Sequence, residues 1–390
     1  MAVGSVVGRL REGGTGLAIV LVLRHAEGSF AVAGAGAAAY LAGGAVSRPL
    51  HGRWVDRAGM GRALVVSSIA NGAALVALAV AAERRGAELA LLALAAVVGM
   101  TLPAFSAAIR AAWPQIVPDL AEHAYAFDTL LYELALITAP AIVAFVAATT
   151  APALSLVALA VAGLGGTLLV VRAAGTDTRI ARQRHGDERA LLSVTVAALV
   201  GVSLFVGLAE GSLTVIVPGV ASQHRVPAVS GLLLSCLAVG GLVGAIGYGT
   251  LTRIRWPRRL VACVAAMLVT LIVLGASDSQ LVVLAAVLAA VGLALSPTLT
   301  TGFIALEREA PAAALAEAFT WASFSASAGA AAGQALAGAL ISGPGLGVAL
   351  WEPACGAFAA LVVAVLLARN RSAAAATRVA VELGTRDLQQ

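Results

Sequence analysis

Lysine is absent from this sequence, and all 25 of its basic side chains other than histidine are arginines. Without lysine the chain cannot form the Gly-Lys-Ser/Thr loop that holds ATP phosphates, which excludes ATP-driven work through such a loop. The five histidines have no paired spacing, and the three cysteines lie apart within apolar runs. The sequence therefore predicts no metal site, no cofactor and no nucleophile–base group typical of an enzyme.

Charge is scarce as well, at 12% of the 390 residues, while 60% are hydrophobic. Soluble domains are roughly 45–50% apolar and about 25% charged. A soluble fold of this length cannot bury such an excess, whereas a lipid bilayer solvates it. The net charge of +5 could suggest nucleic acid, but the arginines form short clusters between apolar runs. This pattern indicates membrane topology, with the lipid bilayer as partner and no nucleic acid.

Twelve apolar runs are long enough to span a bilayer, which needs about 20 residues. The first is the least regular, because its unbroken apolar part, Gly13 to Leu23, is short and its extension includes Arg9 and Arg11. A secretory signal peptide is the alternative for this run. The fold class predicted is all-α, with transmembrane helices at 5–24, 31–50, 62–82, 88–110, 124–147, 151–172, 190–218, 228–251, 259–276, 279–303, 311–342 and 345–368.

The arginines divide unequally between alternate connections. Twenty-one of the 25 lie on one side, and the other side holds only Arg24, Arg84, Arg85 and Arg225. Cytoplasmic segments carry the excess of arginine in membrane proteins. Both termini are therefore expected in the cytoplasm, in a multi-pass protein of the plasma membrane, and an even number of helices follows.

The longest internal polar stretch divides the chain into nearly equal halves. Ala126-Phe127 and Ala318-Phe319 begin the predicted fifth and eleventh helices, 192 residues apart, and two other matches have offsets of 192 and 194. A repeat of this length is typical of transporters built from two similar halves. We expect two six-helix bundles, 1–172 and 190–370, a cytoplasmic linker at 173–189 and a cytoplasmic tail at 371–390.

The segment between the second and third predicted helices carries a motif. Its glycines permit tight turns, and its arginines suit the cytoplasmic surface. It resembles the signature loop of the major facilitator superfamily, with a Gly, an Asp-Arg four residues later, then Gly and a basic residue. The matching residues are Gly52, Arg53, Asp56, Arg57, Gly59 and Arg62, while Met60 and Gly61 replace a frequent basic pair. The resemblance implies a latch between the two halves in one access state; a merely topogenic loop is the alternative.

Ionisable residues inside the predicted helices are few and costly in lipid, so they are candidates for coupling or for lining a cavity. Glu210 lies in the middle of the seventh helix, and Asp128 and Glu133 lie in the fifth. A carboxylate at this depth can load and release a proton. The alternative for Glu210 and Glu133 is a structural pair with Arg9 or Arg110, and the alternative for Asp128 is a pair with Arg110 or the signature loop.

Pro140 is expected to kink the fifth helix. Drug antiporters of the superfamily often have Gly-Pro here, where this chain has Ala139-Pro140. Many proton antiporters of the superfamily also carry an arginine inside the fourth helix, where this chain has only the terminal Arg110. The small residues of the eleventh helix suggest packing.

The sequence thus indicates a secondary transporter that moves a small molecule by alternating access, as a monomer. Proton-coupled efflux is the leading hypothesis, with the proton as partner, because of the family tendency. A facilitator or importer of a sugar or other metabolite is the alternative within this class. An intramembrane enzyme or a non-transporting scaffold is the alternative of another class.

Overall fold

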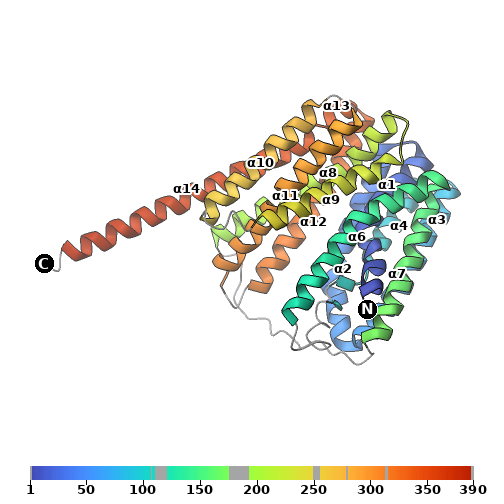
Figure 1. The fold of residues 1–390 in the computed structure, drawn as a ribbon, viewed down its shortest axis with the longest axis horizontal. Coiled ribbons are helices and arrows are strands. Elements are labelled where there is room, and N and C mark those ends of the chain that lie inside the picture. The colour runs from blue at the N-terminus through green and yellow to red at the C-terminus, as the bar shows by residue number, and fades with distance from the viewer. Residues whose placement is uncertain are drawn as a thin grey trace.

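The computed structural model describes residues 2–106, 108–109, 121–174, 193–248, 255–277, 280–311 and 315–387. These residues form twelve helices of 13 residues or more and the four-residue α13 (Figure 1). The helices are α1 (Ala2–Glu27), α2 (Phe30–Ala58), α3 (Met60–Glu83), α4 (Glu88–Met100), α6 (Ala121–Thr149), α7 (Pro152–Ala174), α8 (Val194–Gln223), α9 (Val229–Gly247), α10 (Trp256–Ala276), α11 (Leu281–Glu309), α12 (Leu315–Ser342), α13 (Leu346–Ala349) and α14 (Glu352–Asp387).

Ten of the described helices are long and apolar enough to cross a membrane, and α4 is a shorter apolar helix. α1 is not one of these ten apolar helices, because Arg9, Arg11 and Glu12 lie within it. It is nevertheless one continuous helix from Ala2 onward. The helix order matches the twelve predicted segments, so the all-helical membrane class is confirmed.

The chain runs back and forth, so its connections gather at two ends of the molecule. We call the end that holds the turns at Gly28, 84–87, Thr150, 224–228 and Gly343 the Gly28 end. The opposite end, which holds the turn at Gly59, the end of α7 and the start of α8, is the Gly59 end.

The predicted fourth helix, 88–110, is wrong as a continuous helix. α4 ends at Met100, and Thr101 to Ala104 are not helical. Pro103 supplies no N–H and disfavours a helical residue before it, which explains the break. The Asn71 side-chain amide of α3 donates to the Val98 carbonyl at 2.9 Å and so satisfies one of the carbonyls freed at this break.

Two other predicted boundaries also change. The signature loop is largely helical, because α2 continues to Ala58 and only Gly59, at φ 82°, separates it from α3. The twelfth predicted helix divides into α13 and α14, and α14 continues through the predicted tail to Asp387, beyond the other helices (Figure 1). Arg371 ties α14 to Glu309 of α11 and lies over the ring of Trp256.

Helix packing follows two groups in the chain. α1 packs on α6 and α7, α2 on α4, and α3 on α7; later in the chain α8 packs on α12 and α14, α9 on α11, and α10 on α11 and α14. The main contacts between the two groups join α2 to α12 and α6 to α9, with a smaller contact between α1 and α8.

Small residues bring α8 and α12 together, as expected for the eleventh predicted helix. A Cβ placed on Gly207 or Gly211 would collide with the carbonyl oxygen of Ala326 or Ala330. A Cβ on Gly329 or Gly333 would collide in the same way with carbonyl oxygens of α8. Close backbone approach of this kind strengthens van der Waals packing in membranes.

We therefore predict that Gly207→Val destabilises the protein by about 1–3 kcal/mol through overpacking. Gly201→Val on the same helix is the control, because a Cβ there meets no atom within 4 Å. Thermal melting of the purified protein measures both variants. An equal effect of the two substitutions would contradict this packing.

Candidate functional site

A buried ion pair joins α1 to α6. Arg9 Nη2 donates to both carboxylate oxygens of Asp128, at 2.8 and 2.9 Å, and neither side chain is more than 1% exposed. Arg9 Nη1 also donates to Ser5 Oγ at 2.7 Å. Arg9 was a candidate partner for Glu210 or Glu133, and Asp128 a candidate for pairing with Arg110 or the signature loop; the structure instead pairs Arg9 with Asp128.

A series of hydrogen bonds connects this ion pair to the break in the fourth predicted helix. Arg9 Nε donates to Ser106 Oγ at 3.1 Å, and Ser106 Oγ donates to Glu12 Oε2 at 2.6 Å. The Ser106 N–H also donates to Glu12 Oε1, at 3.3 Å. This N–H belongs to the short helical stretch that starts after the break, where backbone N–H groups lack intrahelical partners. A carboxylate is a favourable acceptor at such a helix start.

Arg11 lies deeper in the same group of helices. Its guanidinium is 1% exposed, donates to Ser68 Oγ at 3.4 Å and lies over the Phe105 ring. Gly163 makes room for it, since a Cβ there would lie 2.9 Å from Arg11 Nη1. Arg9, Arg11 and Glu12 thus give α1 three ionisable side chains within four positions, and both arginines are buried.

Glu210 lies on the face of α8 that points toward α1. Thr214 is one turn further along that face, and its Cγ2 lies 3.7 Å from a Cβ placed on Gly16. α1 and α8 run in the same direction, so Glu12 and Glu210 each lie one turn from this contact, toward the Gly59 end. Glu210 is exposed, while its neighbours Ala209 and Gly211 are buried against the protein.

Glu133 occupies a comparable position on α6. It lies one turn before Ile137, whose carbonyl accepts a hydrogen bond of 2.6 Å from Ser235 Oγ of α9. Glu133 is half-buried, and Asp128 is fully buried. Glu133 and Asp128 therefore face different surroundings. The structure brings neither Glu133 nor Glu210 into an ion pair among the side chains it describes.

Several predicted residues add little here. Arg110 and the side chains of Arg53, Asp56 and Arg57 lie outside the described part of the structure. Arg62 is exposed, and Pro140 lies inside an uninterrupted α6. The cysteines differ in exposure, since Cys263 is buried, Cys236 is half-buried and Cys355 is exposed at the protein surface.

The two helix groups touch through close contacts near the Gly28 end. The Ala31 N–H donates to Ser342 Oγ at 2.9 Å, and the Ser29 and Ser342 hydroxyls lie 3.5 Å apart. A Cβ on Gly34 would collide with the Gln334 carbonyl oxygen, which shows how closely α2 approaches α12. On the other side, a Cβ on Gly231 of α9 would collide with the carbonyl oxygen of Pro140.

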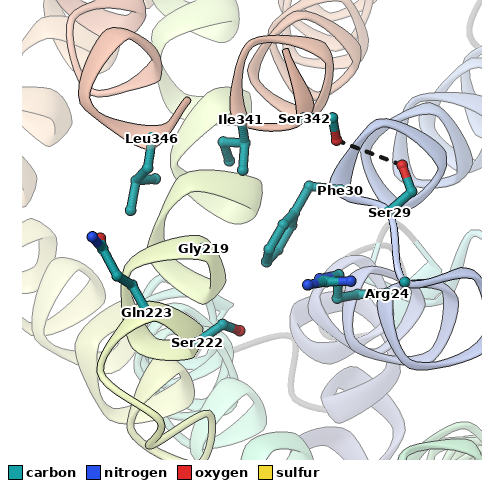
Figure 2. A pocket seen from close by; sticks show the side chains of 10 residues that line it. Arg24, Ser29, Phe30, Gly219, Ser222, Gln223, Ile341, Ser342 and Leu346 are labelled. Carbon is teal, nitrogen blue, oxygen red and sulfur yellow. Dashed lines mark hydrogen bonds between the residues drawn. The ribbon is translucent and has the colours of Figure 1, made fainter. Parts of the chain in front are cut away.

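Two hollows open beside these contacts. The larger has a volume of about 530 Å³, and Figure 2 shows Arg24 and Phe30 reaching into it from one group of helices. The smaller, of about 370 Å³, shares Arg24, Gly28 and Ser222 with the first. Both lie at the Gly28 end and take lining residues from α1 and α8.

Sequence reasoning missed the roles of Glu12, Ser106 and Arg24. Glu12 carried a usable signal, an ionisable residue inside an apolar helix, but the start of that helix was in doubt. Ser106 carried none, because its contacts depend on the unexpected break after Met100.

We predict that Asp128→Asn destabilises the protein strongly, by about 3–5 kcal/mol, because it leaves the Arg9 charge buried without a counter-charge. Glu309→Gln is the control: its partner Arg371 has a side chain that is 41% exposed, and such pairs contribute at most about 1 kcal/mol. Thermal melting and yield measure both. The double variant Arg9→Met/Asp128→Leu should recover part of the loss, and a double variant no better than Asp128→Asn would contradict a charge effect.

Solved structures of known transporters share this architecture. The structure is similar to the nucleoside transporter NupG, with a TM-score of 0.74, 14% identity and coverage of 94% of this chain and 96% of that one. It is also similar to the POT family transporter PepTSo, with a TM-score of 0.73, 13% identity and coverage of 95% and 97%.

A bacterial homologue of the iron transporter ferroportin is similar in two states. In its inward-facing state the TM-score is 0.75, with 15% identity and coverage of 94% of this chain and 97% of that one. In the outward-facing state the TM-score is 0.62, with 15% identity and coverage of 94% and 98%. No curated protein matches the sequence. The model of the Major Facilitator Superfamily matches residues 1–279, so this chain belongs to that superfamily, whose members are membrane transporters.

Proposed function

We propose that this protein is a secondary active transporter that carries a small molecule by alternating access between two six-helix bundles, residues 1–172 and 190–370, joined by a linker at 173–189. The observation that carries the proposal is the uneven distribution of contacts between the two groups of helices. They gather near the Gly28 end, while Glu210 stays exposed one turn nearer the Gly59 end. Among the residues that the structure describes, the two groups are therefore held together at the Gly28 end.

Glycine packing supports two similar halves. In α2 and α4, Gly43 meets the Ala96 carbonyl, and Gly99 meets the Tyr40 carbonyl three residues away on each helix. In α9 and α11, Gly240 meets Ala289 and Gly292 meets Leu237, with the same three-residue steps. A repeated contact pattern at corresponding helices favours a duplicated bundle.

The orientation proposed places the Gly28 end outside the cell and both termini in the cytoplasm of a plasma-membrane protein. The arginine bias supports it, because the connections at the Gly59 end hold most of the arginines. The state proposed is inward-facing. The higher TM-score with the inward-facing ferroportin homologue than with the outward-facing one agrees with closure at the Gly28 end.

Proton coupling is proposed for Glu210, with efflux as the direction and a monomer as the working unit. Glu210 is exposed on the face of α8 toward α1 and has no ion-pair partner among the described residues. Asp128 is excluded from this role by its buried pair with Arg9. Glu133, one turn from the contact between α6 and α9, is the second candidate carboxylate between the groups. The signature loop, from Gly52 to Arg62, is proposed as the latch between the halves.

We predict that Glu210→Gln abolishes flux driven by a pH gradient, because an amide cannot carry the proton. Vesicles with an imposed gradient, screened with cationic dyes and small metabolites, provide the measurement. Glu83→Gln is the control, since this exposed carboxylate lies at the Gly28 end, away from the interface. Flux that ignores the gradient and survives Glu210→Gln would instead identify a facilitator.

We also predict that a disulfide between Ser29→Cys and Ser342→Cys blocks transport, and that a reductant restores it. The two hydroxyls lie 3.5 Å apart on opposite groups of helices, so the bond would hold the Gly28 end closed. The test uses a background with Cys236, Cys263 and Cys355 replaced by alanine, and each single cysteine variant is the control. Full transport by the cross-linked protein would overturn alternating access.

A further inference from the structure

The larger hollow at the Gly28 end is built from both halves of the proposed transporter. Arg24, Ser29 and Phe30 line it from α1 and α2, and Gly219, Gln223 and Ser342 line it from α8 and α12 (Figure 2). Its volume of about 530 Å³ falls in the range of small-ligand sites, about 300–1,000 Å³. Gly219 helps to keep the space open, because a Cβ there would lie 3.2 Å from Ile341 Cδ1.

Arg24 gives this hollow a positive charge. Its guanidinium lies over the Phe30 ring, 4.7 Å from the ring centre. No carboxylate lies within ion-pair distance of Arg24 among the side chains that the structure describes. A guanidinium carries a planar set of N–H donors that fits a carboxylate, so the unused donors of Arg24 favour an anion.

The rest of the lining fits an anion with a flat apolar body. The Ser222 hydroxyl and the Gln223 amide lie on α8, opposite Arg24, and can orient a polar group. Phe30, Ile341 and Leu346 supply apolar surface. A chloride ion would leave most of this volume unfilled, so an organic ion is the better match.

We propose that this hollow is a second binding site, distinct from the interface at Glu210, which takes a small organic carboxylate and stabilises the state closed at the Gly28 end. The site lies across the contact between Ala31 and Ser342, so its two walls part when that contact opens. A ligand that binds only one of two states shifts the population toward that state. Stabilisation of the closed state rests on the alternating access proposed above, whereas binding of the carboxylate does not.

The test uses benzoate as the probe and benzamide, of similar shape but uncharged, as its partner. Binding to the purified full-length protein is measured by titration calorimetry for the parent, Arg24→Gln and Arg225→Gln. Arg225 is the matched control, an exposed arginine at the same end that does not line the hollow. We expect benzoate to bind the parent and Arg225→Gln equally and Arg24→Gln at least about tenfold more weakly, the loss expected for one charge-assisted hydrogen bond.

The effect on conformation is read separately. Spin labels at Arg84→Cys and Gly343→Cys, in the background without native cysteines, report the distance between the two halves at the Gly28 end. Benzoate should increase the short-distance population, and benzamide should not.

Three results would overturn the site: no benzoate binding, equal binding to Arg24→Gln at an unchanged melting temperature, or binding that leaves the distance distribution unchanged. None of them bears on transport, which the disulfide between positions 29 and 342 tests independently.

Discussion

Charged side chains buried in a membrane protein favour polar or charged partners within the protein, and Arg9 and Glu12 of α1 impose this demand on the first group of helices. Arg9 requires a carboxylate, which Asp128 of α6 supplies, and Glu12 requires donors, which Ser106 supplies. Ser106 can offer its backbone N–H only because the fourth span is broken before it. The ion pair, the helix break and the position of α1 therefore depend on one another, and removing any one leaves a buried polar group unsatisfied.

This arrangement also limits which acids remain free for coupling. Asp128 accepts two short hydrogen bonds from one Arg9 nitrogen, so its charge is already compensated. Glu210 faces α1 from the other half, and Glu12 is the ionisable residue at the matching level of α1. Carboxylates from both groups at this level agree with the proton coupling proposed for Glu210. The arginine in the hollow at the Gly28 end favours an anion instead.

Much of the fold could be predicted, because the length and composition of apolar runs identify membrane helices. The twelve segments, the packing role of Gly329 and Gly333 and the superfamily motif could all be read from the chain. The break after Met100 could not, since one proline in a span is often accommodated by a kink. The pairing of Arg9 with Asp128 rather than Glu210 depends on how α6 packs on α1, and single-sequence periodicity does not specify that packing. In the sequence Arg24 is one of only four arginines on the arginine-poor side, and its place beside Phe30 and α8 depends on the tertiary structure.

The contacts that join the halves include the same glycine packing as those within them. Within each group, glycines bring backbones together over several turns, as between α8 and α12 or α9 and α11. Between the groups, Gly34 lies against the Gln334 carbonyl and Gly231 against the Pro140 carbonyl. Separating the halves at the Gly28 end therefore means breaking this packing together with hydrogen bonds of hydroxyls such as Ser342 and Ser235, each worth only about 0.5–1.5 kcal/mol. A ligand that bridges Arg24 and α8 adds an interaction of similar size, which is enough to change the balance between two states that differ by a few kcal/mol.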